Sequence, residues 1–301
     1  MDLLIPSLPT PLQELSDDVI KSAGIRLYIK RDDLIHPTVS GNKWRKLKYN
    51  LQQAIVDEAT TLLTFGGAYS NHLYATAAAG NALGLKTIGM VRGQDYAEKM
   101  TPTLQFCQEQ NMTLHFVSRQ EYKQRNDLEY LQELSTKFNG SYLIPEGGTT
   151  SLALKGVQEM TLEVEEILGR KPDYYAVAAG TGGTAAGILS AENDVLAFSA
   201  LKGGGFLEED IKNLIPENET AGHLTLFTDY HFGGYGKWTQ ELLDFITEFK
   251  STHDIQLEQV YTAKMFYGLY NLIKQDFFKP GTVIVAVHTG GLQGLLKELR
   301  V

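Results

Sequence analysis

Apolar positions along the chain follow two alternating patterns. Short continuous runs rich in β-branched and aromatic residues, such as Thr60–Phe65 and Tyr174–Ala179, predict buried strands. Between these runs, apolar residues recur every three or four positions, as at Trp44, Leu47 and Leu51, and this spacing predicts helices. Strands that alternate with helices predict an α/β fold in which helices cover both faces of parallel sheets, a three-layer αβα arrangement.

The predicted elements fill most of the chain. Strands are expected at residues 26–34, 60–65, 86–91, 113–117, 141–144, 174–179, 194–202, 224–230 and 282–288. Helices are expected at residues 44–57, 70–83, 101–110, 126–138, 151–168, 184–191, 238–249 and 263–273. These strands are too many for one small sheet, and the strand–helix units between about Asn50 and Gly148 look self-contained. We therefore expect two lobes, a larger domain of residues 1–49 and 149–301 and a smaller inserted α/β domain of residues 50–148.

Composition and charge exclude several classes of protein. The chain has 301 residues and a formal net charge of −9, which gives no support to binding of nucleic acid or of an anionic membrane. No apolar run approaches the length of a membrane span, and the N-terminal stretch MDLLIPSLPTP does not resemble a signal peptide. The single cysteine, Cys107, rules out an internal disulfide and a cysteine-based metal cluster. We therefore expect a soluble cytoplasmic protein without a metal site.

A glycine-rich turn follows the strand predicted at 174–179. Its residues, Gly180-Thr181-Gly182-Gly183-Thr184, allow successive N–H groups to point into one concavity at a helix start, which favours a bound phosphate. A P-loop would need Gly-Lys-Ser/Thr at its end, but Gly187 is followed by Ile188. A dinucleotide site would place an acid after the next strand, which ends in Lys202 and glycines instead. A tight turn that binds nothing stays open beside the favoured phosphate site.

Two further turns precede helices. In the stretch TFGGAYSNHL, either Ser70 or Asn71 could cap a helix, and the free N–H groups of Ser70, Asn71 and His72 could hold a carboxylate. In the stretch PEGGTTSLALKG, two glycines stand ahead of a Thr/Ser cap, and taken alone this stretch is only a loop.

Lys43 lies where the turn Ser40–Asn42 becomes a helix. A lysine is a nucleophile only when its amine is neutral, and its reference pKa is about 10.4. The positive end of the helix dipole and the neighbours Arg45, Lys46 and Lys48 disfavour the ammonium form. A desolvated Lys43 could form an imine; the alternative is a solvated lysine on a basic helix face. An imine-forming lysine together with a phosphate cradle indicates pyridoxal 5′-phosphate (PLP), which carries one aldehyde and one phosphate.

Seven stretches, in this order, resemble one known family. They are PTPL, IKRDDLIHPTVSGNKWRKLKYNL, FGGAYSNHLYATAAAGNALGL, IPEGGTTSLALKG, AAGTGGTAAGIL, VYTAKMFYGL and HTGG. In them the chain is similar to the 1-aminocyclopropane-1-carboxylate deaminase/D-cysteine desulfhydrase family of PLP-dependent enzymes. The resemblance implies the two-lobed fold of the tryptophan-synthase-β-like group, known as fold type II, and it implies a homodimer.

The resemblance also implies roles for matching residues. Lys43 would be the Schiff-base lysine and would carry the substrate α-proton, while Asn71 would hydrogen-bond the cofactor's ring hydroxyl. Ser70, with the backbone of Asn71 and His72, would receive the substrate carboxylate. The phosphate would be bound by Gly180, Thr181, Gly182, Gly183 and Thr184.

Two tyrosines match active-site residues of the family. Tyr235 lies in GGYGKW and Tyr261 in VYTAK, and the alternative for each is an aromatic residue of the core. With Lys43 and Ser70 they complete the expected catalytic set.

Position 262 distinguishes two branches of the family. Ring-opening deaminases usually carry a glutamate there, beside the pyridine nitrogen, whereas this chain has Thr262, and Thr289 in HTGG is a second neutral neighbour. A neutral neighbour suits loss of a good leaving group, so a D-cysteine desulfhydrase-like α,β-elimination is favoured, giving an α-keto acid, ammonia and sulfide. The alternative is a 1-aminocyclopropane-1-carboxylate deaminase. The expected class is thus a lyase or a hydrolase acting on a small amino acid.

Two other classes stay open. One is a PLP-binding protein without significant turnover, and the other is a nicotinamide enzyme that uses the turn at 180–185.

Overall fold

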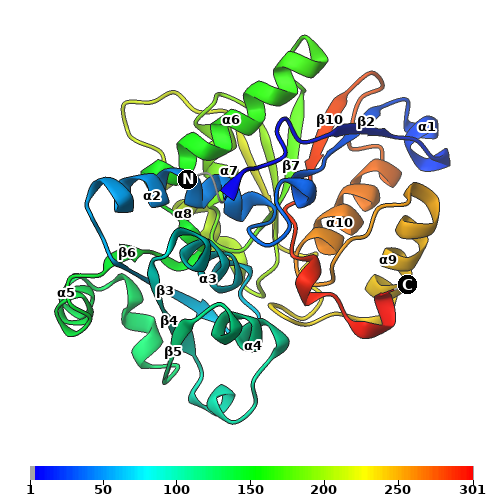
Figure 1. The fold of residues 1–301 in the computed structure, drawn as a ribbon. Helices are drawn as coiled ribbons and strands as arrows, with labels where there is room; N and C mark the ends of the chain where they lie inside the picture. The colour runs from blue at the N-terminus through cyan, green and yellow to red at the C-terminus, as the bar shows by residue number, and fades with distance from the viewer. Residues whose placement is uncertain (1–3, 301) are drawn as a thin grey trace.

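The structure is a computed structural model that describes residues 4–300, and its strands form two sheets (Figure 1). The larger sheet has six strands in the order β1-β2-β10-β7-β8-β9, and the smaller has four in the order β5-β4-β3-β6. The strands are β1 (Leu12–Leu15), β2 (Arg26–Lys30), β3 (Thr61–Gly67), β4 (Lys86–Arg92), β5 (Met112–Val117), β6 (Tyr142–Ile144), β7 (Tyr174–Ala179), β8 (Val195–Ser199), β9 (Leu224–Phe227) and β10 (Val283–Val287).

Helices connect and cover these strands. They are α1 (Asp18–Ala23), α2 (Asn42–Val56), α3 (Asn71–Leu83), α4 (Pro102–Glu109), α5 (Leu128–Lys137), α6 (Ser151–Leu168), α7 (Gly183–Leu189), α8 (Leu207–Asn213), α9 (Gln240–His253) and α10 (Thr262–Lys274). In the larger sheet, α9 and α10 pack on one face and α6 and α7 on the other. The smaller sheet has α2, α3 and α4 on one side and α5 on the other. The predicted α/β fold with helices on both faces of its sheets is therefore confirmed.

Strand pairing departs from the expected all-parallel pattern at one edge. β1 pairs with β2 antiparallel, with Leu12 opposite Lys30 and Leu15 opposite Leu27, whereas the other strand pairs are parallel. The elements β1, α1 and α8 were not expected from the sequence. These elements are four to seven residues long, too short to display a clear hydrophobic period.

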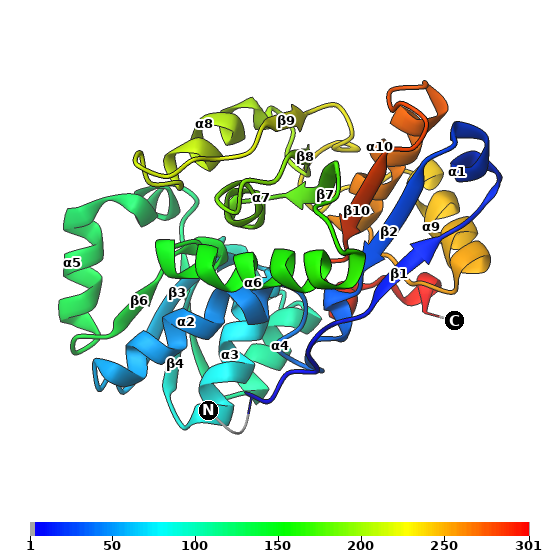
Figure 2. The same ribbon diagram turned by 90° about the horizontal axis from the view of Figure 1, so that it is seen from above.

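The strands divide between two sheets. We propose that they mark the two lobes, residues 1–49 with 149–301 and residues 50–148; residues 1–3 and 301 lie outside the described residues. β3 to β6 all fall within 50–148. Helix α2 crosses the proposed boundary, and Figure 2 shows it beside α6.

A buried group of charged side chains fixes the start of α2. Arg45 Nε donates to Asp32 Oδ2 over 2.6 Å, and Arg45 Nη1 donates to Glu163 Oε1 over 2.9 Å. Lys30 Nζ donates to Glu163 Oε2 over 2.6 Å. The main-chain oxygen of Asp32 also accepts the N–H of Gly41, directly before α2. Because Asp32 follows β2 and Glu163 lies on α6, this network connects the start of α2 to β2 and to α6.

Close packing against α6 also fixes the position of α2. At Gly156 of α6, an added Cβ would lie 2.0 Å from the main-chain oxygen of Arg45, so only glycine allows the two helices to approach this closely. The opposite side of α2 buries Trp44, Leu47 and Leu51 against the smaller sheet. Helix α2 is thus held from both sides.

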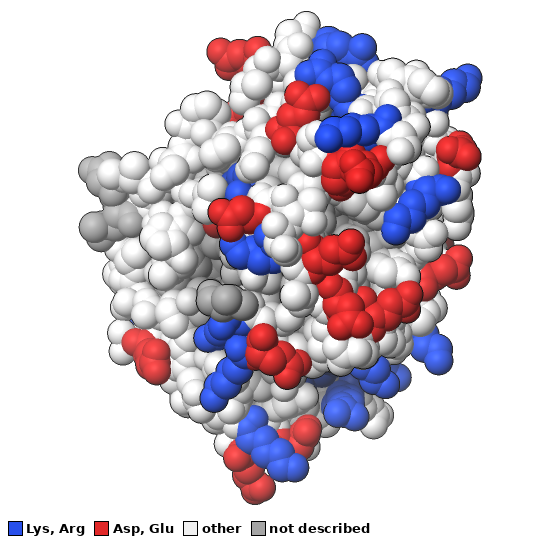
Figure 3. All heavy atoms as spheres, turned by 90° about the vertical axis from the view of Figure 1, so that its right-hand side faces the viewer, with Lys and Arg blue, Asp and Glu red and all other residues white. Residues whose placement is uncertain are grey.

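Three further features concern the surface charge, membrane-spanning helices and metal sites. On the face drawn in Figure 3, basic and acidic side chains are interspersed. Within residues 4–300, no helix is long and apolar enough to cross a membrane, and no group of three or more His, Cys, Asp or Glu side chains is arranged to hold a metal ion.

We expect Asp32→Ala to lower the free energy of unfolding by about 3–5 kcal/mol, because it leaves the guanidinium of Arg45 buried beside one carboxylate instead of two. Urea unfolding followed by circular dichroism measures the change. The matched control is Glu14→Ala, which breaks the exposed Glu14–Arg26 pair and should change the same quantity by less than about 1 kcal/mol. Equal, small effects of the two substitutions would show that the buried network does not stabilise the fold.

Candidate active site

One cavity has a volume of about 620 Å³, within the range of roughly 300–1,000 Å³ that is usual for small-molecule sites. It lies at the carboxyl ends of parallel strands, since its lining includes residues that end or follow β3, β4, β6, β7, β8 and β10. The lining takes in nearly all of the residues expected from the sequence: Lys43, Ser70, Asn71, His72, Gly180, Thr181, Gly182, Gly183, Thr184, Tyr235, Tyr261 and Thr289. Thr262 is the exception. The structure thus brings together groups that are widely separated in the sequence.

Lys43 is the second residue of α2 and projects into the cavity. Its Nζ donates to the main-chain oxygen of Gly147 over a long distance of 3.5 Å. Burial lowers the pKa of Lys43 to about 8, and the negative charge of Glu146 partly offsets this effect. A substantial fraction of the amine is therefore neutral near pH 8.

The cause of this low pKa differs from the one expected. The expected causes were the positive end of the helix dipole and the basic neighbours, but Arg45 is paired with Asp32 and Lys48 with Glu159. Burial is the largest cause, and it depends on the tertiary structure rather than on the local charge pattern.

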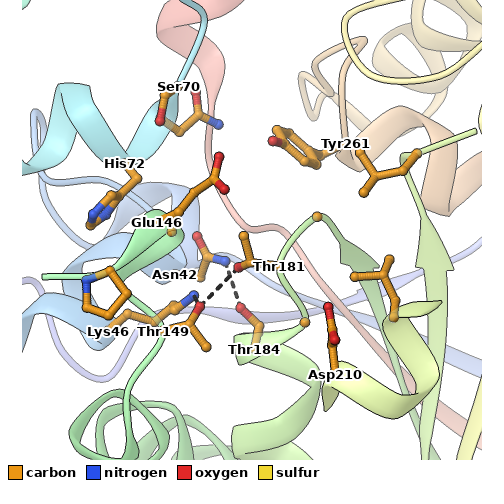
Figure 4. A pocket seen from close by; sticks show the side chains of 18 of the residues that line it. Asn42, Lys46, Ser70, His72, Glu146, Thr149, Thr181, Thr184, Asp210 and Tyr261 are labelled. Atoms are coloured by element: carbon orange, nitrogen blue, oxygen red, sulfur yellow. Dashed lines mark hydrogen bonds between the residues drawn. The ribbon is translucent and has the colours of Figure 1, made fainter. Parts of the chain in front are cut away.

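The glycine-rich turn after β7 forms a polar recess. Gly182 has φ of +75° directly before α7, a conformation that favours glycine. Thr184 Oγ1 accepts a hydrogen bond from Asn42 Nδ2 over 2.7 Å, and Thr181 Oγ1 lies 3.0 Å from Thr149 Oγ1 (Figure 4). These contacts connect the turn to α2 and to the loop before α6.

Lys46 contributes an amine to this recess and was not identified from the sequence. Its Nζ donates to Thr149 Oγ1 over 2.8 Å, and a Cβ added at Gly183 would lie only 2.7 Å from Nζ. Burial and the charge of Lys43 lower the pKa of Lys46 well below its ordinary value. A bound anion would reverse this shift, since it would stabilise the ammonium. Because Lys46 is three residues after Lys43, both lie on one face of α2, and this spacing is the signal that could have revealed it.

The start of α3 provides donors on another wall of the cavity. Ser70 is the N-cap, and its Oγ accepts the N–H of Leu73, so its own hydroxyl proton stays available. Asn71 Oδ1 accepts from Gln293 Nε2 over 2.6 Å, which leaves the Nδ2 group of Asn71 as a donor. The N–H groups at this helix start can bind an anion.

His72 has an assignable tautomer. Thr64 Oγ1 donates its proton to the main-chain oxygen of Ile144, so it accepts from His72 Nε2, 2.7 Å away. Burial and the charges of Lys43 and Lys46 lower the pKa of His72 well below its ordinary value. The ring is thus neutral, and its buried Nδ1 is an acceptor without a hydrogen-bond partner in the described residues.

Tyr235 and Tyr261 lie together, with ring centroids 6.0 Å apart. Burial raises the pKa of Tyr235 to about 12 and that of Tyr261 well above its ordinary value, so both hydroxyls keep their protons at neutral pH. The Glu258 carboxylate accepts the N–H groups of Val260, Tyr261 and Thr262, which fixes the start of α10.

Thr262 is fully buried beneath this site. Its Oγ1 accepts the N–H of Glu258 and lies 3.2 Å from Glu258 Oε1. Of the two threonines expected beside the ring nitrogen, Thr262 and Thr289, only Thr289 lines the cavity.

Comparisons with known proteins agree with this geometry. Residues 5–194 match the pyridoxal-phosphate dependent enzyme family. A bifunctional D-cysteine desulfhydrase/1-aminocyclopropane-1-carboxylate deaminase of Arabidopsis thaliana is 32% identical, covering 97% of this chain and 78% of its own. A D-cysteine desulfhydrase of Klebsiella pneumoniae is 29% identical, covering 95% and 93%. The solved structure of an ACC deaminase homologue superposes with a TM-score of 0.83 at 30% identity, covering 97% and 91%.

The chain belongs to the pyridoxal-phosphate dependent enzyme family. The predicted cofactor, fold and lyase/deaminase type are thereby confirmed, whereas the hydrolase class also expected is not supported and is withdrawn. The residues of this PLP-dependent enzyme fit the cofactor on structural grounds. The space at Gly183 that a Cβ would fill lies beside Lys46, as a phosphate site requires, and a lysine of low pKa lines the same cavity.

The pKa of Lys43 predicts how this PLP-dependent enzyme takes up its cofactor. Because covalent capture of an aldehyde requires a neutral amine, the capture rate by cofactor-free protein should rise with pH, with a midpoint near 8. Stopped-flow absorbance measures this rate. Nα-acetyl-lysine is the control, since its midpoint should lie near its ordinary pKa of about 10.4. A protein midpoint equal to that of the control would contradict the burial of Lys43.

Proposed function

We propose that the protein catalyses α,β-elimination from a small amino acid, with D-cysteine as the favoured substrate and pyruvate, ammonia and hydrogen sulfide as products. The observation that carries this proposal is that Lys43, with its pKa near 8, lines one cavity with the glycine nest and the start of α3. The cavity therefore combines a base, an anion site for the cofactor and an anion site for the substrate. The named activities of the Arabidopsis and Klebsiella relatives support this choice of reaction.

We propose that the following groups bind the cofactor. The nest at 180–184 and Lys46 would hold its phosphate, Lys43 would bond to its aldehyde, and the free Nδ2 of Asn71 would donate to its ring hydroxyl. When bound, PLP supplies an electron sink that stabilises negative charge at the substrate α-carbon. Thr289 is favoured over Thr262 as the neighbour of the ring nitrogen, because only Thr289 lines the cavity.

The substrate would be oriented by α3 and deprotonated by Lys43. The N–H groups at the start of α3 and the hydroxyl of Ser70 would bind its carboxylate. This contact would direct the α-hydrogen towards Lys43 Nζ, which acts as the general base while its amine is neutral. The walls of the cavity would exclude water from the proton transfer.

Tyr235 and Tyr261 would act near the leaving group. Both are protonated at neutral pH and can donate a hydrogen bond to a group that gains electrons. The contact between the two tyrosines lowers the pKa of Tyr235 and raises that of Tyr261, which favours Tyr235 as the donor. The departing hydrosulfide would accept this bond.

Deamination of 1-aminocyclopropane-1-carboxylate is the second candidate, and the name of the Arabidopsis relative favours it. Thr289, the proposed neighbour of the ring nitrogen, is a neutral hydroxyl rather than a carboxylate, which supports elimination as the main activity. Retention of Lys43, Ser70 and both tyrosines in one cavity supports turnover over mere cofactor binding.

We further propose a cytoplasmic homodimer. The resemblance to the family supports the dimer, and the single, buried Cys107 suits a reducing compartment. The Arabidopsis relative is named as mitochondrial, so fractionation of the native host would decide the compartment.

We expect Lys43→Ala to lower keto-acid release from D-cysteine by at least about 100-fold, since it removes both the covalent anchor and the base. Keto-acid release should be compared among D-cysteine, L-cysteine, D-serine and 1-aminocyclopropane-1-carboxylate. Borohydride followed by mass spectrometry should label wild-type protein at Lys43 and leave the variant unlabelled.

Lys48→Ala is the matched control, because Lys48 lies on the same helix but pairs with Glu159 outside the cavity. It should keep both activity and label. Normal turnover by Lys43→Ala would refute the assigned base. Release from 1-aminocyclopropane-1-carboxylate alone would replace the first proposed reaction by the second.

A further inference from the structure

Glu146 is a carboxylate in the cavity for which the proposed reaction has no use so far. It opens the short helix η5 (Glu146–Gly148), directly after β6. β6 pairs in parallel with β3, and β3 leads to Ser70 and Asn71 at the start of α3. The loops after two neighbouring parallel strands meet at one edge of the sheet, so Glu146 and the proposed carboxylate site share a wall.

Two donors hold this carboxylate in a fixed orientation. Tyr122 Oη donates to Glu146 Oε1 over 2.7 Å, and Arg125 Nε donates to Glu146 Oε2 over 2.6 Å. Both donors belong to η4 (Glu121–Asn126). A carboxylate has about four acceptor positions, so each oxygen keeps capacity for a further donor. The Glu146 side chain is 27% exposed, and it lines the cavity.

The free side of Glu146 faces the space for the substrate. Figure 4 shows its carboxylate pointing into the open part of the cavity between Ser70 and Tyr261. Its charge reaches the reacting groups, since it raises the pKa values of Lys43, Tyr235 and Tyr261. An amino acid bound at α3 would therefore extend its side chain towards this carboxylate, whose charge is partly balanced by the guanidinium of Arg125.

This charge discriminates among substituents on the substrate β-carbon. A carboxylate only accepts hydrogen bonds, so it attracts an ammonium and repels a second carboxylate or a developing thiolate. An amine leaves carbon readily only when protonated, and a nearby carboxylate favours the protonated form. Of small β-substituents, an ammonium thus gains most from Glu146.

We propose that the protein also eliminates ammonia from 2,3-diaminopropionate, with Glu146 binding the β-ammonium. This inference rests on the proposed elimination reaction and names a second substrate class for the same site. Lys43 takes the α-proton, the Cβ–N bond breaks, and its electron pair leaves with the nitrogen as neutral ammonia. The remaining enamine adds water after release and gives pyruvate and a second ammonia, so no oxidant or reductant is needed.

The decisive experiment compares kcat/KM for 2,3-diaminopropionate and for cysteine, each as both enantiomers, in the wild-type holoenzyme and in Glu146→Gln. The substitution keeps the shape and removes the charge. Since Glu146 also raises the pKa of Lys43, it affects all substrates to some degree, and the ratio between substrates removes this shared effect. We expect the diaminopropionate/cysteine ratio to fall about 10- to 100-fold, the range for loss of a hydrogen bond between charged groups.

Two control variants accompany this comparison. Glu146→Asp retains a carboxylate and should recover part of the ratio. Glu129→Gln removes an exposed carboxylate on α5, outside the cavity, and should leave the ratio unchanged. The absorbance of the bound cofactor and the melting temperature confirm that each variant is folded.

A binding measurement provides a readout that does not depend on turnover. 2,4-Diaminobutyrate carries its second ammonium one carbon further out, and norvaline is its uncharged counterpart of equal length. Calorimetry on wild-type protein should show tighter binding of diaminobutyrate, and Glu146→Gln should abolish this preference.

The outcomes separate the two proposals. Turnover of cysteine without turnover of diaminopropionate would overturn the role of Glu146 and leave the elimination reaction standing. An equal loss with both substrates in Glu146→Gln would also overturn it, because the carboxylate would then act only through Lys43. Wild-type protein inactive on both substrates would refute the proposed function and the inference that rests on it.

Discussion

The buried contact between Arg45 and Asp32 determines where the reactive amine lies. Asp32 binds Arg45 through its carboxylate and Gly41 through its main-chain oxygen, so one residue positions both the turn before α2 and the first turn of α2. Glu163 binds the same guanidinium from α6. Lys43 lies between these two anchored points, and its direction into the cavity follows from them. The charges are buried, so removing one partner is expected to disturb the site as well as the fold.

The cavity contains two buried lysine amines, Lys43 and Lys46, whose charged forms would be stabilised by bound anions. Lys43 and Lys46 are both buried, the charge of Lys43 lowers the pKa of Lys46, and both lower the pKa of His72. A phosphate beside Lys46 and a carboxylate at the start of α3 would supply the missing negative charge. The protein thus keeps an electrostatic imbalance in its free state that favours an anionic cofactor and an anionic substrate group. Glu146 and Asp210 are carboxylates of the same lining, and Glu146, which lies near Lys43, indicates where a positive group fits.

Sequence patterns predicted the features that depend on local geometry. The turn at 180–184, the helix start at Ser70 and the position of Lys43 all follow from residues adjacent in the chain, and the structure brings them into one cavity. Lys46 and Glu146 were missed because their roles depend on what packs around them: Gly183 and Thr149 for Lys46, Tyr122 and Arg125 for Glu146. Thr262 lies on the expected segment, but the Glu258 carboxylate turns its hydroxyl into the protein. The assignment of residues to two lobes and of single residues to roles stays a prediction.

Glu146 links two requirements that oppose each other. Burial lowers the pKa of Lys43, which provides the neutral amine needed for bonding to an aldehyde, whereas Glu146 raises it and so makes the freed amine a stronger base for the α-proton. A pKa near 8 lies between these demands and close to neutral pH. The same charge stabilises a protonated leaving group and disfavours an anionic one. A single carboxylate, held by Tyr122 and Arg125, therefore couples the strength of the base to the choice of substrate, and neither property can be changed at position 146 without the other.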